Sequence, residues 1–323
     1  MSETIFKPVK IRGATILITA TTILSNLIGL ARDKVIALHF GTSATTDIYN
    51  ASFLIPDTLF NLFIAGALAA AFMPVFSKYL QEDQKEAMKI ANIMATVTSL
   101  AILVLSILAF IFMKNIIAIS FPNVSVDTQK SIVDMTKLML PSAIIFAISG
   151  ILGNILMSYK HFTSYSISPL LYNLGIILGI LFLNKSTGIY SAAIGVLIGA
   201  ILHCLVRILD VIKTPYSYKT TFEIFHPGFK KIIKLMIPRS LTLVVWQINL
   251  YIFAVVRMSM ITGGLAAFYF ARNIQSLHHP FRDWRHNPFK TNSNPRPYRR
   301  TIQYEFGKLN IASTLFLRHL NPF

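Results

Sequence analysis

The sequence has little of what a soluble enzyme requires. It contains one cysteine, Cys204, which excludes a disulfide framework and a cysteine-based metal site. Charged residues make up only 13% of the chain, about half the usual share. No His or Cys pair has metal-ligand spacing, no glycine-rich phosphate loop follows a strand, and no paired carboxylates share an apolar run. These absences argue against an enzyme and predict neither a cofactor nor a metal.

Apolar residues are what the chain has in abundance, at 54% with a mean hydropathy of +0.59. About twenty apolar residues in a helix cross a bilayer core. The composition therefore predicts an all-α, polytopic membrane protein. The first run is too long for a removable signal peptide and has no small-residue cleavage pattern. We expect about eight spans: Ala14–Phe40, Asp47–Tyr79, Ala87–Met113, Ile132–Tyr159, Ser166–Leu183, Tyr190–Val211, Phe229–Met258 and Gly264–Leu277.

The basic residues between these spans are unevenly distributed, which predicts an orientation. With a cytoplasmic amino terminus, only Lys114, Lys130 and Lys185 lie outside, and all other loop lysines lie inside. These lysines and a basic tail account for the net charge of +17, so we expect no nucleic-acid partner. The connection from Lys213 to Lys234 is rich in lysine and aromatic residues. It is either an amphipathic segment on the inner leaflet or a solvated loop.

The pair Arg32–Asp33 lies inside the first membrane-length run. Ionisable groups at such depth cost several kcal/mol in hydrocarbon, so they usually face a water-filled cavity. The pair therefore favours a transporter. An arginine in such a cavity can bind phosphate oxygens through several donors. The alternatives are an arginine that extends to the interface, or a neutralising pair with Asp33, although adjacent helical residues point about 100° apart.

Other residues have weaker claims to function. Arg272 lies in the last short run and can face inward, whereas Asp47 can be the N-cap of the second span. Pro56 and Gly66 interrupt the second span and are candidate hinges, or they serve only helix packing. Gly175 and Gly179 have the spacing of a packing pair. His203 is read as a satisfied core or interfacial histidine rather than a ligand.

A run of short motifs in the first two spans is specific in order and spacing. These are Gly29-Leu30-Ala31-Arg32-Asp33-Lys34, Phe40-Gly41, Thr46-Asp47, Phe53 to Pro56 and Phe63 to Phe72. They resemble the start of the MurJ/MviN lipid II flippases of the MOP exporter superfamily, and the resemblance extends to about Leu277. It implies a two-lobed transporter with residues 1–228 as the first lobe of six spans and 229–277 as the start of the second. The expected setting is a bacterial cytoplasmic membrane.

The resemblance also implies a substrate and a site. The substrate would be lipid II, a peptidoglycan precursor on an undecaprenyl-pyrophosphate carrier, moved by alternating access without covalent chemistry. Family members line the cavity with several arginines and acids, of which Arg32 and Asp47 are matched. Arg272 lies next to the position of the eighth-span arginine. The remaining positions hold other residues: Asn26, Phe60, Asn61, Ala65 and Asn273.

From these matches we expect a substrate site of Asn26, Arg32, Asp47 and Arg272, together with contacts to membrane lipids. The small number of cavity arginines leaves two alternatives open. One is another exporter of the superfamily, for a polysaccharide-linked lipid or for drugs. The other is a membrane scaffold that transports nothing.

Residues 278–323 differ from the rest of the chain, since they are rich in Pro and Arg and lack apolar periodicity. We expect them to be disordered. Read one base forward, codons for Phe281 to Arg285 can encode Phe-Gly-Ile-Gly, similar to the Phe-Gly-Ile-Ala with which the family continues. The expectation is therefore an out-of-frame tail on an incomplete transporter, with a native basic tail as the alternative. The nucleotide sequence decides between them.

Overall fold

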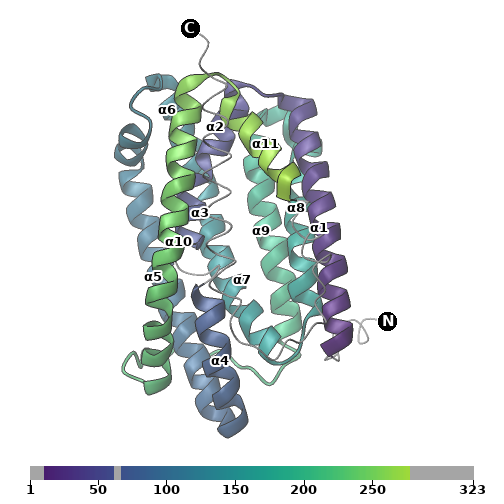
Figure 1. Cartoon of the computed structure of the whole chain (residues 1–323), viewed down its shortest axis with the longest axis vertical. Coiled ribbons are helices and arrows are strands. Elements are labelled where there is room, and N and C mark those ends of the chain that lie inside the picture. The colour runs from purple at the N-terminus through teal and green to yellow at the C-terminus, as the bar shows by residue number, and fades with distance from the viewer. Residues whose placement is uncertain (1–10, 62–66, 277–323) are drawn as a thin grey trace, which may run out of the picture. The chain divides into compact units, whose positions relative to one another are not determined.

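The computed structural model describes residues 11–61 and 67–276, and within them it contains helices and no strand. This confirms the all-α prediction. The expectations for Gly66 and for residues 278–323 lie outside the described residues. Figure 1 shows the helices in chain order. They are α1 (Ile11–Phe40), α2 (Ala44–Ser52), α3 (Leu54–Phe60), α4 (Ala67–Glu82), α5 (Gln84–Ser120), α6 (Val126–Met139), α7 (Pro141–Ser158), α8 (Thr163–Thr187), α9 (Tyr190–Val211), α10 (Pro227–Met260) and α11 (Gly264–Ser276).

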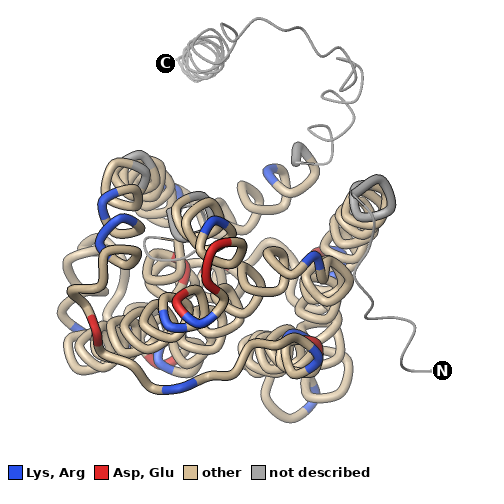
Figure 2. The backbone as a smooth tube through the Cα atoms, turned by 90° about the horizontal axis from the view of Figure 1, so that it is seen from below, with Lys and Arg blue, Asp and Glu red and all other residues tan. Residues whose placement is uncertain are grey.

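The helices run up and down between two ends of a bundle (Figure 1). At the upper end lie the connections 41–43, 121–125, 188–189 and 261–263. At the lower end lie residues 83, 159–162 and 212–226. Figure 2 looks along the bundle from below and shows that most helical positions carry no charge. The few charged positions inside the bundle are therefore informative.

The outer surface of the bundle is apolar over most of its height. On α5, the side chains of Leu103, Ile107, Ile111 and Phe112 are all exposed, and α10 similarly exposes Trp246 and its neighbours. Soluble proteins rarely leave apolar patches of this extent uncovered. Six helical stretches are long and apolar enough to cross a membrane: Ile16–Phe40, Gln84–Ser120, Val126–Ser158, Thr163–Thr187, Tyr190–Val211 and Leu243–Met260. The chain is thus a polytopic membrane protein.

Two of the predicted spans are irregular. The second, Asp47–Tyr79, is divided among α2, α3 and α4. Pro56 has no N–H to donate to the carbonyl of Ser52, the residue at which α2 ends. The fourth span has only a local irregularity at Leu140, between α6 and α7, where Pro141 occupies the first position of α7 and Leu140 keeps helical backbone angles. The eighth is represented by α11, whose 13 described residues extend about 20 Å.

The helices α8 and α9 pack through glycines on both sides. A Cβ atom added to Gly175 would lie 2.3 Å from the Cα of Gly199, and one added to Gly179 would lie 2.5 Å from the Cα of Gly195. Both distances are too short for real atoms, so the two backbones approach as closely as glycine permits. The predicted packing role of Gly175 and Gly179 is confirmed.

The connection 212–226 contains no helix and most of its side chains are exposed, which is compatible with either expectation for Lys213 to Lys234. It is an irregular segment that lies along the lower part of α5. Asn92 donates from Nδ2 to the carbonyl of Ser217 at 3.2 Å, and Thr96 Oγ1 lies 3.1 Å from the Tyr218 hydroxyl. Lys89 and Glu223 form an ion pair at 2.6 Å. Polar side chains of α5 therefore hold this segment in place.

Candidate functional site

The charged pair of α1 lies at the centre of a network that joins three helices. Arg32 donates from Nε and Nη2 to Asp33 Oδ1 at 3.0 and 2.8 Å, and from Nη1 to Asn173 Oδ1 on α8 at 3.0 Å. Asn273 on α11 donates from Nδ2 to Asp33 Oδ2 at 2.7 Å. Such charge-assisted bonds are about twice as strong as neutral ones. The network holds α1 against α8 and α11.

The network forms one wall of a cavity of about 290 Å³, which we call the charged cavity. Four ionisable side chains of opposite sign line it: Arg32, Asp33, Asp57 and Arg272. Tyrosine and phenylalanine rings from α2, α8 and α11 complete the lining. Arg272 also lies over the ring of Tyr269, with 6.0 Å between its Cζ and the ring centroid. The lining can contact an anion and a cation.

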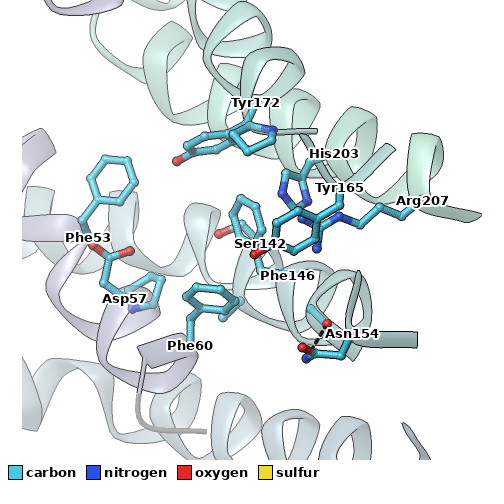
Figure 3. Close-up of a pocket in the computed structure, with 14 residues that line it drawn as sticks. Phe53, Asp57, Phe60, Ser142, Phe146, Asn154, Tyr165, Tyr172, His203 and Arg207 are labelled. Atoms are coloured by element: carbon cyan, nitrogen blue, oxygen red, sulfur yellow. Dashed lines mark hydrogen bonds between the residues drawn. The ribbon is translucent and has the colours of Figure 1, made fainter. Parts of the chain in front are cut away.

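A second cavity of about 350 Å³ adjoins the first, and Asp57, Phe53 and Tyr172 line both. We call it the aromatic cavity because rings dominate its walls. Figure 3 shows Asp57 and Phe60 of α3, with Phe53 just before this helix, on one side and Tyr165, His203 and Arg207 on the other. The two cavities therefore form a path through the interior of the bundle with Asp57 between them.

Arg207 and His203 are held in the wall of the aromatic cavity by hydrogen bonds. Arg207 is buried, and it donates from Nε to Ser168 Oγ at 2.9 Å and from Nη1 to the carbonyl of Ser149 at 2.7 Å. The Ser149 hydroxyl lies 2.8 Å from His203 Nδ1. The predicted core role of His203 fits these contacts. Among the described residues, no group of three or more His, Cys, Asp or Glu side chains could hold a metal.

Asp47 makes a different contact at the upper end of the bundle. Its carboxylate accepts hydrogen bonds from the backbone N–H of Gly263 at 2.6 Å and of Ala266 at 2.8 Å. Asp47 therefore caps α11, whereas Ser43 is the N-cap of α2 and receives the Thr46 N–H. Gly263 has φ +80°, and a Cβ atom there would lie 2.3 Å from the carbonyl oxygen of Thr42. The α1–α2 and α10–α11 turns are thus in close backbone contact.

The structure brings together three of the four predicted site residues. Asn26 and Arg32 line a cleft of about 170 Å³ between α1, α8 and α11, and Arg32 also lines the charged cavity with Arg272. Asp47 lies apart, at the α11 cap. The hinge candidate Pro56 lines the aromatic cavity. For Arg32 the structure combines two of the predicted alternatives, since the residue both pairs with Asp33 and faces the cavity.

Asp57, Tyr172 and Arg207 are cavity residues that the sequence reasoning did not assign to a site. A signal existed for Asp57, because it follows Pro56 inside the apolar run Leu54 to Phe60. The argument from buried charge that identified Arg32 applies equally to it. Tyr172 carried no comparable signal, since an aromatic residue in a span is more often packed against its neighbours.

Comparison with known proteins identifies the family. The sequence profile described as "Lipid II flippase MurJ" matches residues 36–279. The chain belongs to the MurJ family. This is a family of transporters rather than of enzymes. The match begins after Arg32 and Asp33, so the motif around Gly29 lies just outside it, and it includes Asp47, Asp57 and Arg272.

Curated MurJ relatives are similar over roughly half of their own length. The lipid II flippase MurJ of Burkholderia cenocepacia is 27% identical over 248 residues, which are 74% of this chain and 48% of the relative. The probable lipid II flippase MurJ of Rickettsia prowazekii is 26% identical over 262 residues, which are 80% of this chain and 52% of the relative. The chain spans about half the length of the curated MurJ proteins that it matches.

A solved structure supports the assignment to the MurJ family. A lipid II flippase MurJ in an inward closed conformation superposes with a TM-score of 0.70 at 30% identity, covering 81% of this chain and 55% of that one. An inward-facing multidrug resistance MATE transporter of the MOP superfamily superposes with a TM-score of 0.61 at 18% identity. The superposition covers 79% of this chain and 59% of that one. The second likeness concerns the fold alone.

Proposed function

We propose that this chain is the first lobe and the beginning of the second lobe of a flippase. Its substrate is lipid II, a precursor on an undecaprenyl-pyrophosphate carrier, which it moves across the bacterial cytoplasmic membrane for peptidoglycan synthesis. The single observation that carries the proposal is the position of Arg32. Its guanidinium lies at membrane depth in a multi-helix network and lines two adjoining cavities of a MurJ-family bundle.

Arg32 retains capacity to bind an anion despite its partners. A guanidinium has five N–H donors. Within the described part of the chain, two of these N–H groups donate to Asp33 and one donates to Asn173. Two N–H groups therefore have no hydrogen-bond acceptor among the described residues. Arg272 faces the same cavity from α11. Two arginines on different helices can contact different oxygens of one pyrophosphate, so separation of the helices would release it.

The upper end corresponds to a closed outer gate. The lysines of the described chain lie mainly at the lower end, which supports a cytoplasmic location for that end and for the amino terminus. The opposite end is held by the Asp47 bonds to Gly263 and Ala266. In alternating access, opening to the outside requires these bonds to break while a contact at the other end forms. Asp47 therefore serves the gate and not the headgroup.

The test is binding of dodecyl pyrophosphate to the 323-residue chain in nanodiscs, measured by isothermal titration calorimetry. Arg32→Gln is expected to weaken binding about tenfold or more, because it removes charged donors from a partly dehydrated site. Lys185→Gln, a matched loss of charge at the upper end, should bind like the wild type. Equal affinity of Arg32→Gln and wild type would show that the arginine is structural and would refute the site.

One observation favours a second candidate, an exporter of organic cations. The aromatic cavity combines five aromatic rings with the carboxylate of Asp57, an arrangement that binds cationic drugs. Tetraphenylphosphonium distinguishes the two: the flippase proposal expects dodecyl pyrophosphate to bind and tetraphenylphosphonium not to displace it. A scaffold without transport is expected to bind neither.

A further inference from the structure

The charges of the charged cavity are balanced, which is unexpected for a site that binds only a pyrophosphate. Two arginines, Arg32 and Arg272, face two aspartates, Asp33 and Asp57. Asp33 already neutralises Arg32 through two hydrogen bonds at 3.0 and 2.8 Å. A doubly charged anion would therefore leave the Asp57 carboxylate close to like charge. A ligand that brings its own cation removes this repulsion.

Asp57 differs from Arg32 and Asp33 in how its side chain is held. Within the described residues, no hydrogen bond or ion pair fixes its carboxylate, whereas Asp33 has partners on two helices. Asp57 interacts electrostatically with Arg272 and, more weakly, with Arg32. Its side chain is exposed to the cavities, and it lines both of them. A carboxylate at this depth needs a cationic partner, and the space beside it is open.

The surroundings of Asp57 favour an ammonium group as that partner. Phe53, Phe60 and Tyr172 line the aromatic cavity with it, and Figure 3 shows them around the same open space. The faces of aromatic rings attract cations, and the attraction grows when water is excluded. A ring-lined site with one carboxylate therefore suits an alkylammonium. It suits a hydrated metal ion poorly, because such an ion needs several oxygen ligands and Asp57 supplies the only carboxylate among these four side chains.

We infer that Asp57 is a specificity-determining residue, which binds a primary ammonium group on the same headgroup whose phosphates contact Arg32 and Arg272. This inference rests on the proposed function and names the substrate class more closely, as an amphiphile with both a pyrophosphate and an amine. Binding then leaves no charge in the cavity unpaired. The phosphates contact Arg272, and the ammonium group pairs with the carboxylate of Asp57.

The experiment compares two synthetic ligands on the full chain in nanodiscs. One is a dodecyl pyrophosphate whose distal phosphate carries a 6-aminohexyl chain, and the other is the same compound with its amine acetylated. Calorimetry gives both dissociation constants for the wild type, for Asp57→Asn and for Asp57→Ser. Asp134→Asn is the matched control, because Asp134 is exposed on α6 and lines none of the cavities described above.

The wild type and the Asp134→Asn control should bind the free amine about tenfold more tightly than the acetylated compound, as expected for one charge-assisted contact. Both Asp57 variants should lose this preference and bind the acetylated compound at least as tightly as the wild type does. Equal affinity of the wild type for the two ligands overturns the inference, even if the variants fail to fold. A preference that persists in Asp57→Asn also overturns it. Failure of the wild type to bind either ligand refutes the proposed headgroup site itself.

Discussion

Replacement of Asp47 by alanine tests how α2 is joined to α11. Asp47 is 3% exposed, and its carboxylate accepts hydrogen bonds from the backbone N–H groups of Gly263 and Ala266 at 2.6 and 2.8 Å. Both donors belong to the start of α11, where no intrahelical acceptor is available to them. Alanine removes the only side-chain acceptor that the described structure offers to these two groups. The α2–α11 contact should therefore open more often.

The expected magnitude follows from the two donors. A buried N–H group left without a partner costs about 1–3 kcal/mol, so the two together cost about 2–6 kcal/mol. The lower limit corresponds to roughly a 30-fold change in the opening equilibrium. Loss of the negative charge at the helix start adds to this cost, since acidic groups stabilise helix N-termini. Asp47→Asn retains one acceptor oxygen and should give an intermediate effect.

Hydrogen exchange followed by mass spectrometry measures this opening directly. In Asp47→Ala, the segment that contains Gly263 and Ala266 should exchange at least about 30-fold faster than in the wild type, while the middle of α9 is unchanged. Ser43→Ala is the control, because it removes the N-cap of α2 without touching α11. Unchanged exchange at α11 in Asp47→Ala would refute the assignment of Asp47 to the gate.

Four further substitutions test the packing of the bundle. Gly175→Ala should lower stability by about 1–3 kcal/mol, since the new Cβ would lie 2.3 Å from Gly199 Cα, and thermal unfolding should show this against Gly29→Ala, where the nearest contact is 3.9 Å. Gly263→Ala should speed exchange of α11 as Asp47→Ala does, because φ is +80° and Thr42 O would be 2.3 Å away. Asp210→Ala should destabilise the chain by about 3 kcal/mol in denaturant titrations, since His161 and Ser164 both bond this buried carboxylate. Thr96→Val should make residues 213–225 more sensitive to limited proteolysis, because Tyr218 and the Thr221 N–H lose their partner, and unchanged cleavage would contradict the role given to these bonds.

The helices were largely predictable because a membrane restricts the chain to few structures. Backbone groups in hydrocarbon must bond within the segment, so a long apolar run has to be a helix. The predicted span Tyr190–Val211 coincides with α9 at both ends. The interruptions were harder to place. Pro56 marked the second span as irregular, but its division at Ser52 depends on which carbonyl loses its donor.

A site residue was predictable only where its own charge and position in the sequence were sufficient to identify it. Arg32 was identified from its charge and depth. Its pairing with Asp33 was only one of the open alternatives, because positions about 100° apart on a helix argue against contact, and the long side chain is what allows Nε and Nη2 to turn back. The partners of Asp47 lie 216 and 219 residues away in the chain. No local pattern contains that information, so tertiary structure was needed to show what Asp47 caps.

We propose that a lipid-linked pyrophosphate binds between α1, α3 and α11. Lipid II with a photo-reactive group on its headgroup, incorporated with the 323-residue chain in vesicles, tests this directly when cross-linked peptides are mapped by mass spectrometry. Cross-links are expected at residues 26–33, 53–60 and 269–273, and they should be lost in Arg32→Gln. Cross-links confined to the apolar outer face of α5, around Leu103 to Phe112, would show that the lipid only surrounds the bundle and would contradict a binding site inside it.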